Sequence, residues 1–177
     1  MGLTQKPQPV KLFCSIFSQD VEKMNKAKQL LIAKFGALDF ESNLLSFEYT
    51  SYYEKEFGPH LKRIFVSFKK LIKPEQLWRI KILTNKIENI LRISDKRTVN
   101  IDPGYISQAN LVLATTKAYS HRIYINCGIY EETTLLYKKH AFLPLPWTYP
   151  DYKSQECLEI FLKIRENLFE QLKQLAK

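Results

Sequence analysis

Residues 113–124 read LATTKAYSHRIY and bring together side chains that can hold an anion and move a proton. Thr116 and Lys117 end an apolar run, and His121 and Arg122 begin a second one. Lysine and arginine neutralise phosphate or carboxylate groups, threonine donates hydrogen bonds, and histidine transfers protons near neutral pH. The same residues also suit an ordinary solvated turn. Which interpretation holds depends on the elements that position them.

The run 121–137 is long and rich in β-branched residues, and we expect it to form one continuous strand. Because strand side chains alternate between faces, Arg122, Tyr124 and Glu132 then share one polar face. His121 falls on the opposite, mostly apolar face. We therefore expect Arg122 to contact an anion, and His121 to be the weaker candidate, as a proton donor.

Gly128 leaves a second interpretation open, in which Asn126, Cys127 and Gly128 turn a hairpin and the alternation of faces fails. The preceding run, 109–116, should pair antiparallel with 121–137 across the KAYS connection. That pairing would bring the lysine of KAYS close to the basic pair that follows. The polar face could equally be the solvated side of an antiparallel sheet.

Further polar and aromatic residues lie on other predicted elements. Lys81, Asn85 and Glu88 follow an i, i+4, i+7 spacing on one helix, where we expect Lys81 and Glu88 to form a solvated network. In the loop HAFLPLPWTYPDY, we expect Trp147 to plug the end of the sheet and Tyr149 to be partly exposed. The sequence defines no metal ligands and no cofactor. The candidate catalytic residues are Asp102, His121, Glu132 and Asp151, and the candidate ligand-binding residues are Asn85, Tyr105, Thr116, Lys117, Arg122, Tyr124 and Tyr149.

The elements that would position these residues follow an α+β pattern. Residues 10–100 have the order β-α-β-β-α-β, which predicts a ferredoxin-like unit with both helices on one face of an antiparallel sheet. Residues 101–177 add antiparallel strands, the aromatic loop and a C-terminal helix whose apolar stripe should pack on the sheet, or alternatively dimerise. The predicted strands are 11–17, 45–49, 63–68 and an extended segment before the Pro-Gly turn at 103–104, and the predicted helices are 20–35 and 74–92.

Composition places the chain among ordinary globular proteins. It has 177 residues, of which 45% are hydrophobic and 25% charged, and we expect a single domain, 1–177, in the cytoplasm and not in a membrane. Its three cysteines are far apart and should be small buried residues. The net charge of +9 suits either a polyanionic partner or a solvated lysine-rich surface. No P-loop, dinucleotide-binding, zinc-protease or nucleophile-elbow motif occurs.

Several short motifs together resemble the bacterial family of unknown function DUF4416. They are PVKLF, TSYYEKEFG, RIFVSFKKLI, IKILTNKIEN, VNIDPGYIS, VLATTK, HRIY and WTYPDY, in this order and over nearly the full length. Some members of that family carry the label GTP-binding protein, which no motif of this sequence explains. The family pattern includes many polar and aromatic residues, so the resemblance implies a site without assigning its chemistry. Ser51 stands where the family motif has an acidic residue, which argues against a catalytic role for that loop.

These observations favour a protein that binds a phosphorylated or otherwise anionic small molecule, such as a nucleotide, in a polar pocket. Whether it is an enzyme is left open by the sequence. Two alternatives from other classes remain: a nucleic-acid-binding module, and an assembly protein that works through its C-terminal helix. The oligomeric state is likewise open.

Overall fold

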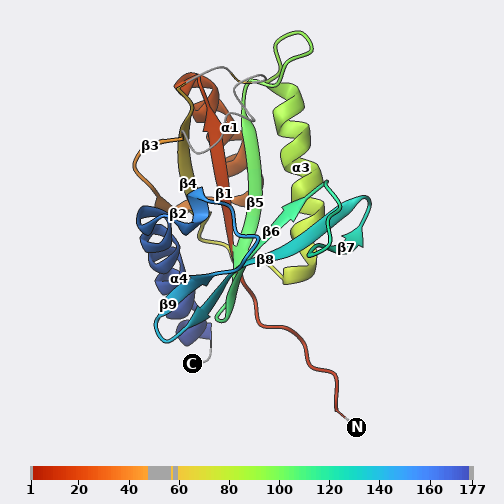
Figure 1. Ribbon diagram of the computed structural model, residues 1–177, viewed down its shortest axis with the longest axis vertical. Helices are drawn as coiled ribbons and strands as arrows, with labels where there is room; N and C mark the ends of the chain where they lie inside the picture. The colour runs from red at the N-terminus through yellow and green to blue at the C-terminus, as the bar shows by residue number, and fades with distance from the viewer. Residues whose placement is uncertain (1, 48–56, 58–59, 176–177) are drawn as a thin grey trace.

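The computed structural model of the protein describes residues 2–47, 57 and 60–175. Within them, strands and helices are mixed up to residue 106, and strands then dominate until a last long helix (Figure 1). None of the described helices is long and apolar enough to cross a membrane. The elements in chain order are β1 (Lys11–Ser18), α1 (Val21–Phe35), β2 (Leu38–Glu41), β3 (Leu45–Ser46), β4 (Lys62–Phe68), a 3₁₀ turn (Pro74–Gln76), α3 (Leu77–Ile90), β5 (Asn100–Ile106), β6 (Asn110–Thr115), β7 (Ile123–Asn126), β8 (Ile129–Lys138), β9 (Ala141–Pro144), a second 3₁₀ turn (Asp151–Lys153) and α4 (Gln155–Leu175).

The sheet confirms the predicted ferredoxin-like unit. Its antiparallel strands follow the order β2-β4-β1-β5-β6-β8-β7, with β3 beside β4 and β9 beside β8. The first four of these strands have the order of a βαββαβ unit, in which each helix connects two strands that flank a third. The remaining strands extend the same sheet beyond β5, so the second part of the chain continues the first.

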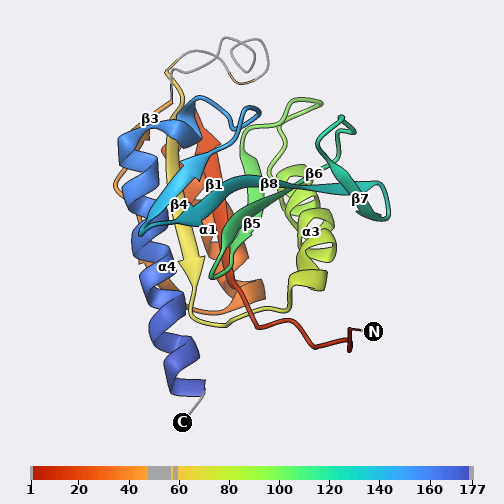
Figure 2. The ribbon, with the colours of Figure 1, turned by 60° about the horizontal axis from the view of Figure 1, so that its bottom comes forward.

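The central strand β1 is buried on both faces, which explains why apolar residues occupy both of its faces in the sequence KLFCSIFS. Leu12, Cys14 and Ile16 point to the face that α1 and α3 cover. Phe13 points to the other face, where its ring lies 5.7 Å from Phe161 of α4. Figure 2 shows α4 on the side of the sheet opposite α1 and α3. The apolar stripe of α4 is therefore buried within the chain, as predicted, and the alternative use in dimerisation loses its main argument.

Local signals at both predicted helix starts are confirmed. The Asp20 carboxylate accepts hydrogen bonds from the main-chain N–H groups of Glu22 (2.8 Å) and Lys23 (3.2 Å), so it caps α1. Gly36 ends the helix with a φ of 91°, a conformation that costs glycine little. Pro74 opens the turn before α3, at a position where its missing N–H is not needed.

Strands β5 and β6 are paired over only part of their length. Gly104 faces Leu113 and Ile106 faces Leu111, but no pairing continues towards Asn100. Pro103, the residue before the paired stretch, has no N–H to offer a neighbour. A Cβ at position 104 would lie 2.5 Å from the carbonyl oxygen of Val112, so only glycine allows β6 to approach here. Beyond this point the two strands separate.

The continuous strand predicted over 121–137 is wrong, and the hairpin alternative is correct. β7 and β8 pair antiparallel, and Cys127 and Gly128 form the turn with φ values of 48° and 76°. A two-residue turn with positive φ at both positions matches the twist of the flanking strands. The predicted antiparallel pairing of 109–116 with this run is confirmed for its second half, because β6 pairs with β8. The first half forms β7, which lies at the edge of the sheet and not beside β6.

Other differences are local. The second strand of the ferredoxin-like unit begins earlier than predicted, at Leu38. Of the predicted 45–49 strand, the structure describes residues 45–47, and Leu45 and Ser46 pair with β4. Tyr49, Ser51 and most of the loop TSYYEKEFGPH lie outside the described residues. Cys14 and Cys157 are buried as predicted, whereas Cys127 is exposed because it occupies the hairpin turn.

Candidate functional site

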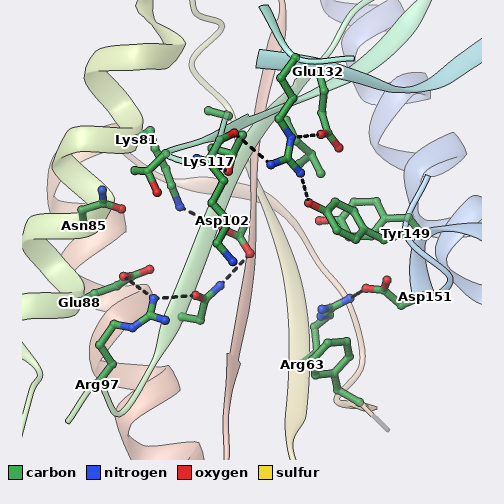
Figure 3. A pocket seen from close by; sticks show the side chains of 18 of the residues that line it. Arg63, Lys81, Asn85, Glu88, Arg97, Asp102, Lys117, Glu132, Tyr149 and Asp151 are labelled. Carbon is green, nitrogen blue, oxygen red and sulfur yellow. Dashed lines mark hydrogen bonds and ion pairs between the residues drawn. The ribbon is translucent and has the colours of Figure 1, made fainter. Parts of the chain in front are cut away.

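A cleft of about 790 Å³ opens where β5 and β6 separate (Figure 3). The helix α3 forms one wall, and residues around the end of β6 and the loop before the second 3₁₀ turn form the other. Its size lies within the range of small-molecule sites in proteins. Eight of the eleven predicted site residues line it: Asn85, Asp102, Thr116, Lys117, Arg122, Glu132, Tyr149 and Asp151.

On the α3 wall, Lys81 and Glu88 take the place of the strand that is missing beside β5. Lys81 Nζ donates to the carbonyl oxygen of Ile101 (3.1 Å), and Glu88 Oε1 accepts from the Ile101 N–H (2.6 Å). Buried main-chain groups need such partners, and β6 has already turned away. The two side chains are only 6% and 4% exposed, so the predicted solvated network is wrong. Burial raises the pKa of Glu88 above its ordinary value.

Asp102 lies on the floor of the cleft in a chain of polar contacts. Lys81 Nζ also donates to Asp102 Oδ1 (3.0 Å), and Asn100 Nδ2 donates to Asp102 Oδ2 (2.7 Å). Burial alone would raise the pKa of this carboxyl, but the Lys81 charge and hydrogen bond outweigh that effect and hold the pKa below its ordinary value. Arg97 Nη1 completes the chain by donating to Asn100 Oδ1 (3.0 Å) and Glu88 Oε2 (3.3 Å).

On the opposite wall, Glu132 is held by both members of the predicted basic pair. Arg122 Nε donates to Glu132 Oε2 (2.6 Å), and His121 Nε2 lies 3.0 Å from the same oxygen. The predicted separation of these residues onto two faces is wrong. They precede β7, and strand alternation does not apply there. Arg122 also donates to the carbonyl oxygen of Lys117 (3.0 Å) and to Tyr149 Oη (2.7 Å), so the expected proximity of Lys117 and Arg122 is confirmed.

Arg63 and Asp151 form a buried ion pair at the lower end of this wall. The guanidinium of Arg63 lies 3.7 Å from the centre of the Phe47 ring, within the range of a cation–π contact. Arg63 Nε is buried and has no hydrogen-bond partner in the part of the chain that the structure describes. Asp151 is thus engaged by a cation, which suits it to positioning Arg63 better than to accepting a proton.

Three predicted site residues do not line the cleft. His121 contacts Glu132 and stacks on Trp147, with ring centres 5.0 Å apart. Tyr105 packs against the apolar residues beneath α3, and Tyr124 packs on Tyr130 in the β7–β8 hairpin. Trp147 is 39% exposed, so the prediction that it plugs the sheet is wrong, whereas the partial exposure predicted for Tyr149 is confirmed.

Several residues of the cleft escaped prediction as site residues. Asn100 is two positions from the predicted Asp102 on β5 and shares its face, which is a signal that strand alternation could have revealed. Lys81 and Glu88 were recognised as a stripe but assigned to solvent. Arg63 and Arg97 carried no local signal, because only the fold brings them to the cleft. Among the described residues, no three His, Cys, Asp or Glu side chains group as metal ligands.

Comparison with known proteins gives a family and no activity. Residues 8–168 match the model of the domain of unknown function DUF4416. No curated protein and no solved structure matches the chain. The match spans most of the 177 residues and includes every residue that lines the cleft. The chain belongs to the DUF4416 family, as the resemblance of its motifs predicted.

Proposed function

We propose that the cleft binds a phosphorylated or otherwise anionic small molecule. The observation that carries the proposal is the set of cationic side chains that converge on one concave surface of ligand-binding size. They come from β4, α3, the segment before β5, the end of β6 and the segment before β7, and the tertiary fold brings them together. They are Arg63, Lys81, Arg97, Lys117 and Arg122.

The anion would bind near the end of β6, around Lys117 and Arg122. A guanidinium carries five N–H groups, and three of those on Arg122 donate to Glu132, Lys117 and Tyr149. These three bonds hold the guanidinium in place, and two N–H groups remain for a ligand. Such preorganisation lowers the entropy cost of binding. Thr116 stands next to Lys117 on the same rim and can add a hydroxyl donor.

Calorimetric titration with inorganic phosphate, ribose 5-phosphate and nucleotides tests this proposal. We expect saturable binding of at least one anion, weakened about tenfold or more by Lys117→Ala, which corresponds to a loss of roughly 1.4 kcal/mol. Lys138→Ala is the matched control, because Lys138 is exposed at the far end of β8 and does not line the cleft. The proposal is wrong if none of these anions binds, or if both variants bind like the wild type.

A second candidate function, nucleic-acid binding, is favoured by a different observation. A smaller hollow of about 250 Å³ is lined by the cations Lys34, Lys70 and Arg79 and by no acidic residue. Lys69 and Lys73 are exposed beside it, so this region of the surface is strongly basic. Binding of single-stranded RNA that falls steeply with added salt, and falls further in a Lys34→Ala, Lys70→Ala double variant, would support this function. No RNA binding at low salt would exclude it.

A further inference from the structure

We propose that the occupant of the cleft is a phosphate monoester with an uncharged polar body, of the class of nucleoside monophosphates, and that Asn85 recognises that body. This inference rests on the proposed function and adds the substrate class and a specificity-determining residue. Two independent observations carry it. The first is the balance of charge around the cleft, and the second is which of the α3 side chains that face the cleft already have hydrogen-bond partners.

Over the described residues that line the cleft, positive and negative charges almost balance. The described lining residues include five cations and four carboxylates. Each carboxylate contacts a cation, in the pairs Asp102–Lys81, Glu88–Arg97, Glu132–Arg122 and Asp151–Arg63.

This balance limits how much negative charge a ligand can bring. A phosphate monoester carries about 1.5 to 2 negative charges at pH 7. The rim formed by Thr116, Lys117 and the spare N–H groups of Arg122 can satisfy one such group. Further phosphates would have to lie deeper, against the pairs Asp102–Lys81 and Glu88–Arg97, whose cations are already engaged by carboxylates. The cleft therefore selects a single phosphate over a triphosphate.

The neutral body would meet α3, where Asn85 is the residue suited to recognise it. Asn85 lies one turn from Lys81 and nearly one turn from Glu88, and it points into the cleft between them (Figure 3). Its two neighbours are turned to Ile101 and Asp102, so their polar groups are already engaged. The Asn85 amide makes no hydrogen bond to any residue that the structure describes.

An amide both donates and accepts, so Asn85 suits an uncharged group that also does both, such as a base edge or a sugar hydroxyl. Asn89 lines the cleft one turn further along α3 and extends the same neutral surface. In contrast, no arginine or lysine of α3 is left to receive a second phosphate along this wall. The geometry thus separates a phosphate end at β6 from a neutral end at α3.

Calorimetric titration of the full chain with matched ligands tests the inference. The ligands are inorganic phosphate, ribose 5-phosphate, and the monophosphates and Mg²⁺-loaded triphosphates of adenosine, guanosine and uridine. We expect at least one monophosphate to bind about tenfold more tightly than its own triphosphate, and more tightly than inorganic phosphate. Asn85→Leu, close in size but without the amide, should weaken that monophosphate about tenfold and leave inorganic phosphate unchanged.

Two variants separate this inference from the function beneath it. Lys117→Ala should weaken every phosphate ligand, whereas Lys86→Ala, an exposed α3 residue outside the cleft, should weaken none. If no ligand binds at all, the proposed function fails. If phosphate ligands bind through Lys117 but triphosphates bind more tightly, or Asn85→Leu affects inorganic phosphate and monophosphate alike, only the inference is overturned. Unchanged melting temperatures of the Asn85 and Lys86 variants show that folding is not the cause.

Discussion

The helices α1 and α3 cover the same face of the sheet and have nearly equal lengths, yet they bury different kinds of residue. The helix α1 packs on β1 and β4, each of which has a neighbouring strand on both sides. The helix α3 packs on β5 at the place where β6 departs. The buried residues of α1 are Met24, Ala27 and Leu31, whereas those of α3 are Leu77, Ile80, Lys81, Thr84, Ile87 and Glu88.

This difference shows what a helix must supply in each setting. Where every strand has a neighbour on both sides, the main-chain N–H and carbonyl groups are already hydrogen-bonded within the sheet. The helix that covers it then needs only apolar side chains. At an open seam, the helix must also bond the main chain that a departing strand has left, as Lys81 and Glu88 do for Ile101. The same opening leaves room for a ligand, so polar burial on α3 and the cleft have one common cause.

The largest effect should come from removing the buried cation of α3. Lys81→Met leaves the Asp102 carboxylate and the Ile101 carbonyl oxygen without their partner, and we expect a loss of about 3–5 kcal/mol in the free energy of unfolding. The matched change on α1, Lys28→Met, removes a pair with the half-exposed Glu41 and should cost about 1 kcal/mol or less. Urea denaturation measures both, and equal losses would contradict the distinction between the helices.

A pH effect of intermediate size should come from Glu131, on the strand that packs against the other flank of α3. Glu131 lies opposite Ala114, which contacts Leu77, and one of its carboxylate oxygens is buried without a described partner. Burial raises the pKa of Glu131 to about 7. An acid with a raised folded-state pKa stabilises the fold in its protonated form. This stabilisation is complete below the unfolded-state pKa and is lost as the pH rises through about 7.

The melting temperature of the wild type should therefore decrease as the pH rises from 5 to 8. The raised pKa of Glu88 contributes to this decrease in the same direction. We expect Glu131→Gln to raise the melting temperature at pH 8 by about 3 °C, the size of roughly 1 kcal/mol in a chain of this length. At pH 5 the variant and the wild type should melt together. Glu22→Gln, at an exposed position of α1, is the control and should follow the wild type. If Glu131→Gln is no more stable than the wild type at pH 8, the claim that burial raises the pKa of Glu131 is wrong.

The smallest effect should come from removing the side chain that caps the N-terminus of α1. The Asp20 side chain caps α1, so Asp20→Ala should lower the free energy of unfolding by about 1 kcal/mol. Asn also accepts these hydrogen bonds, and Asp20→Asn should retain most of the stability. Urea denaturation distinguishes the two variants. An Asn variant as unstable as the Ala variant would show that the carboxylate acts through its charge and not as a cap.

Local sequence patterns predicted the elements well, because helix periodicity, Asp20, Gly36 and Pro74 act within a few residues of one another. Eight of the eleven candidate site residues line the cleft, because several of them lie at strand and helix ends that the fold brings to one place. Local patterns failed where the alternation of side chains between the two strand faces was continued across Gly128. A two-residue turn separates two strands there, and the alternation starts again in the second strand. Local patterns also failed for Lys81 and Glu88, because a polar helix stripe looks the same over solvent and over an open seam.

By itself, the sequence determined the α+β class, the ferredoxin-like order, the burial of the α4 stripe and membership of the DUF4416 family. Only the tertiary structure decided that β5 and β6 separate beyond Gly104, and that the buried Arg63, Lys81 and Glu88 come together around the opening. The reason is physical. Periodicity records which face of one element is apolar, whereas a cleft depends on where two strands stop pairing and on which distant side chains take over their hydrogen bonds.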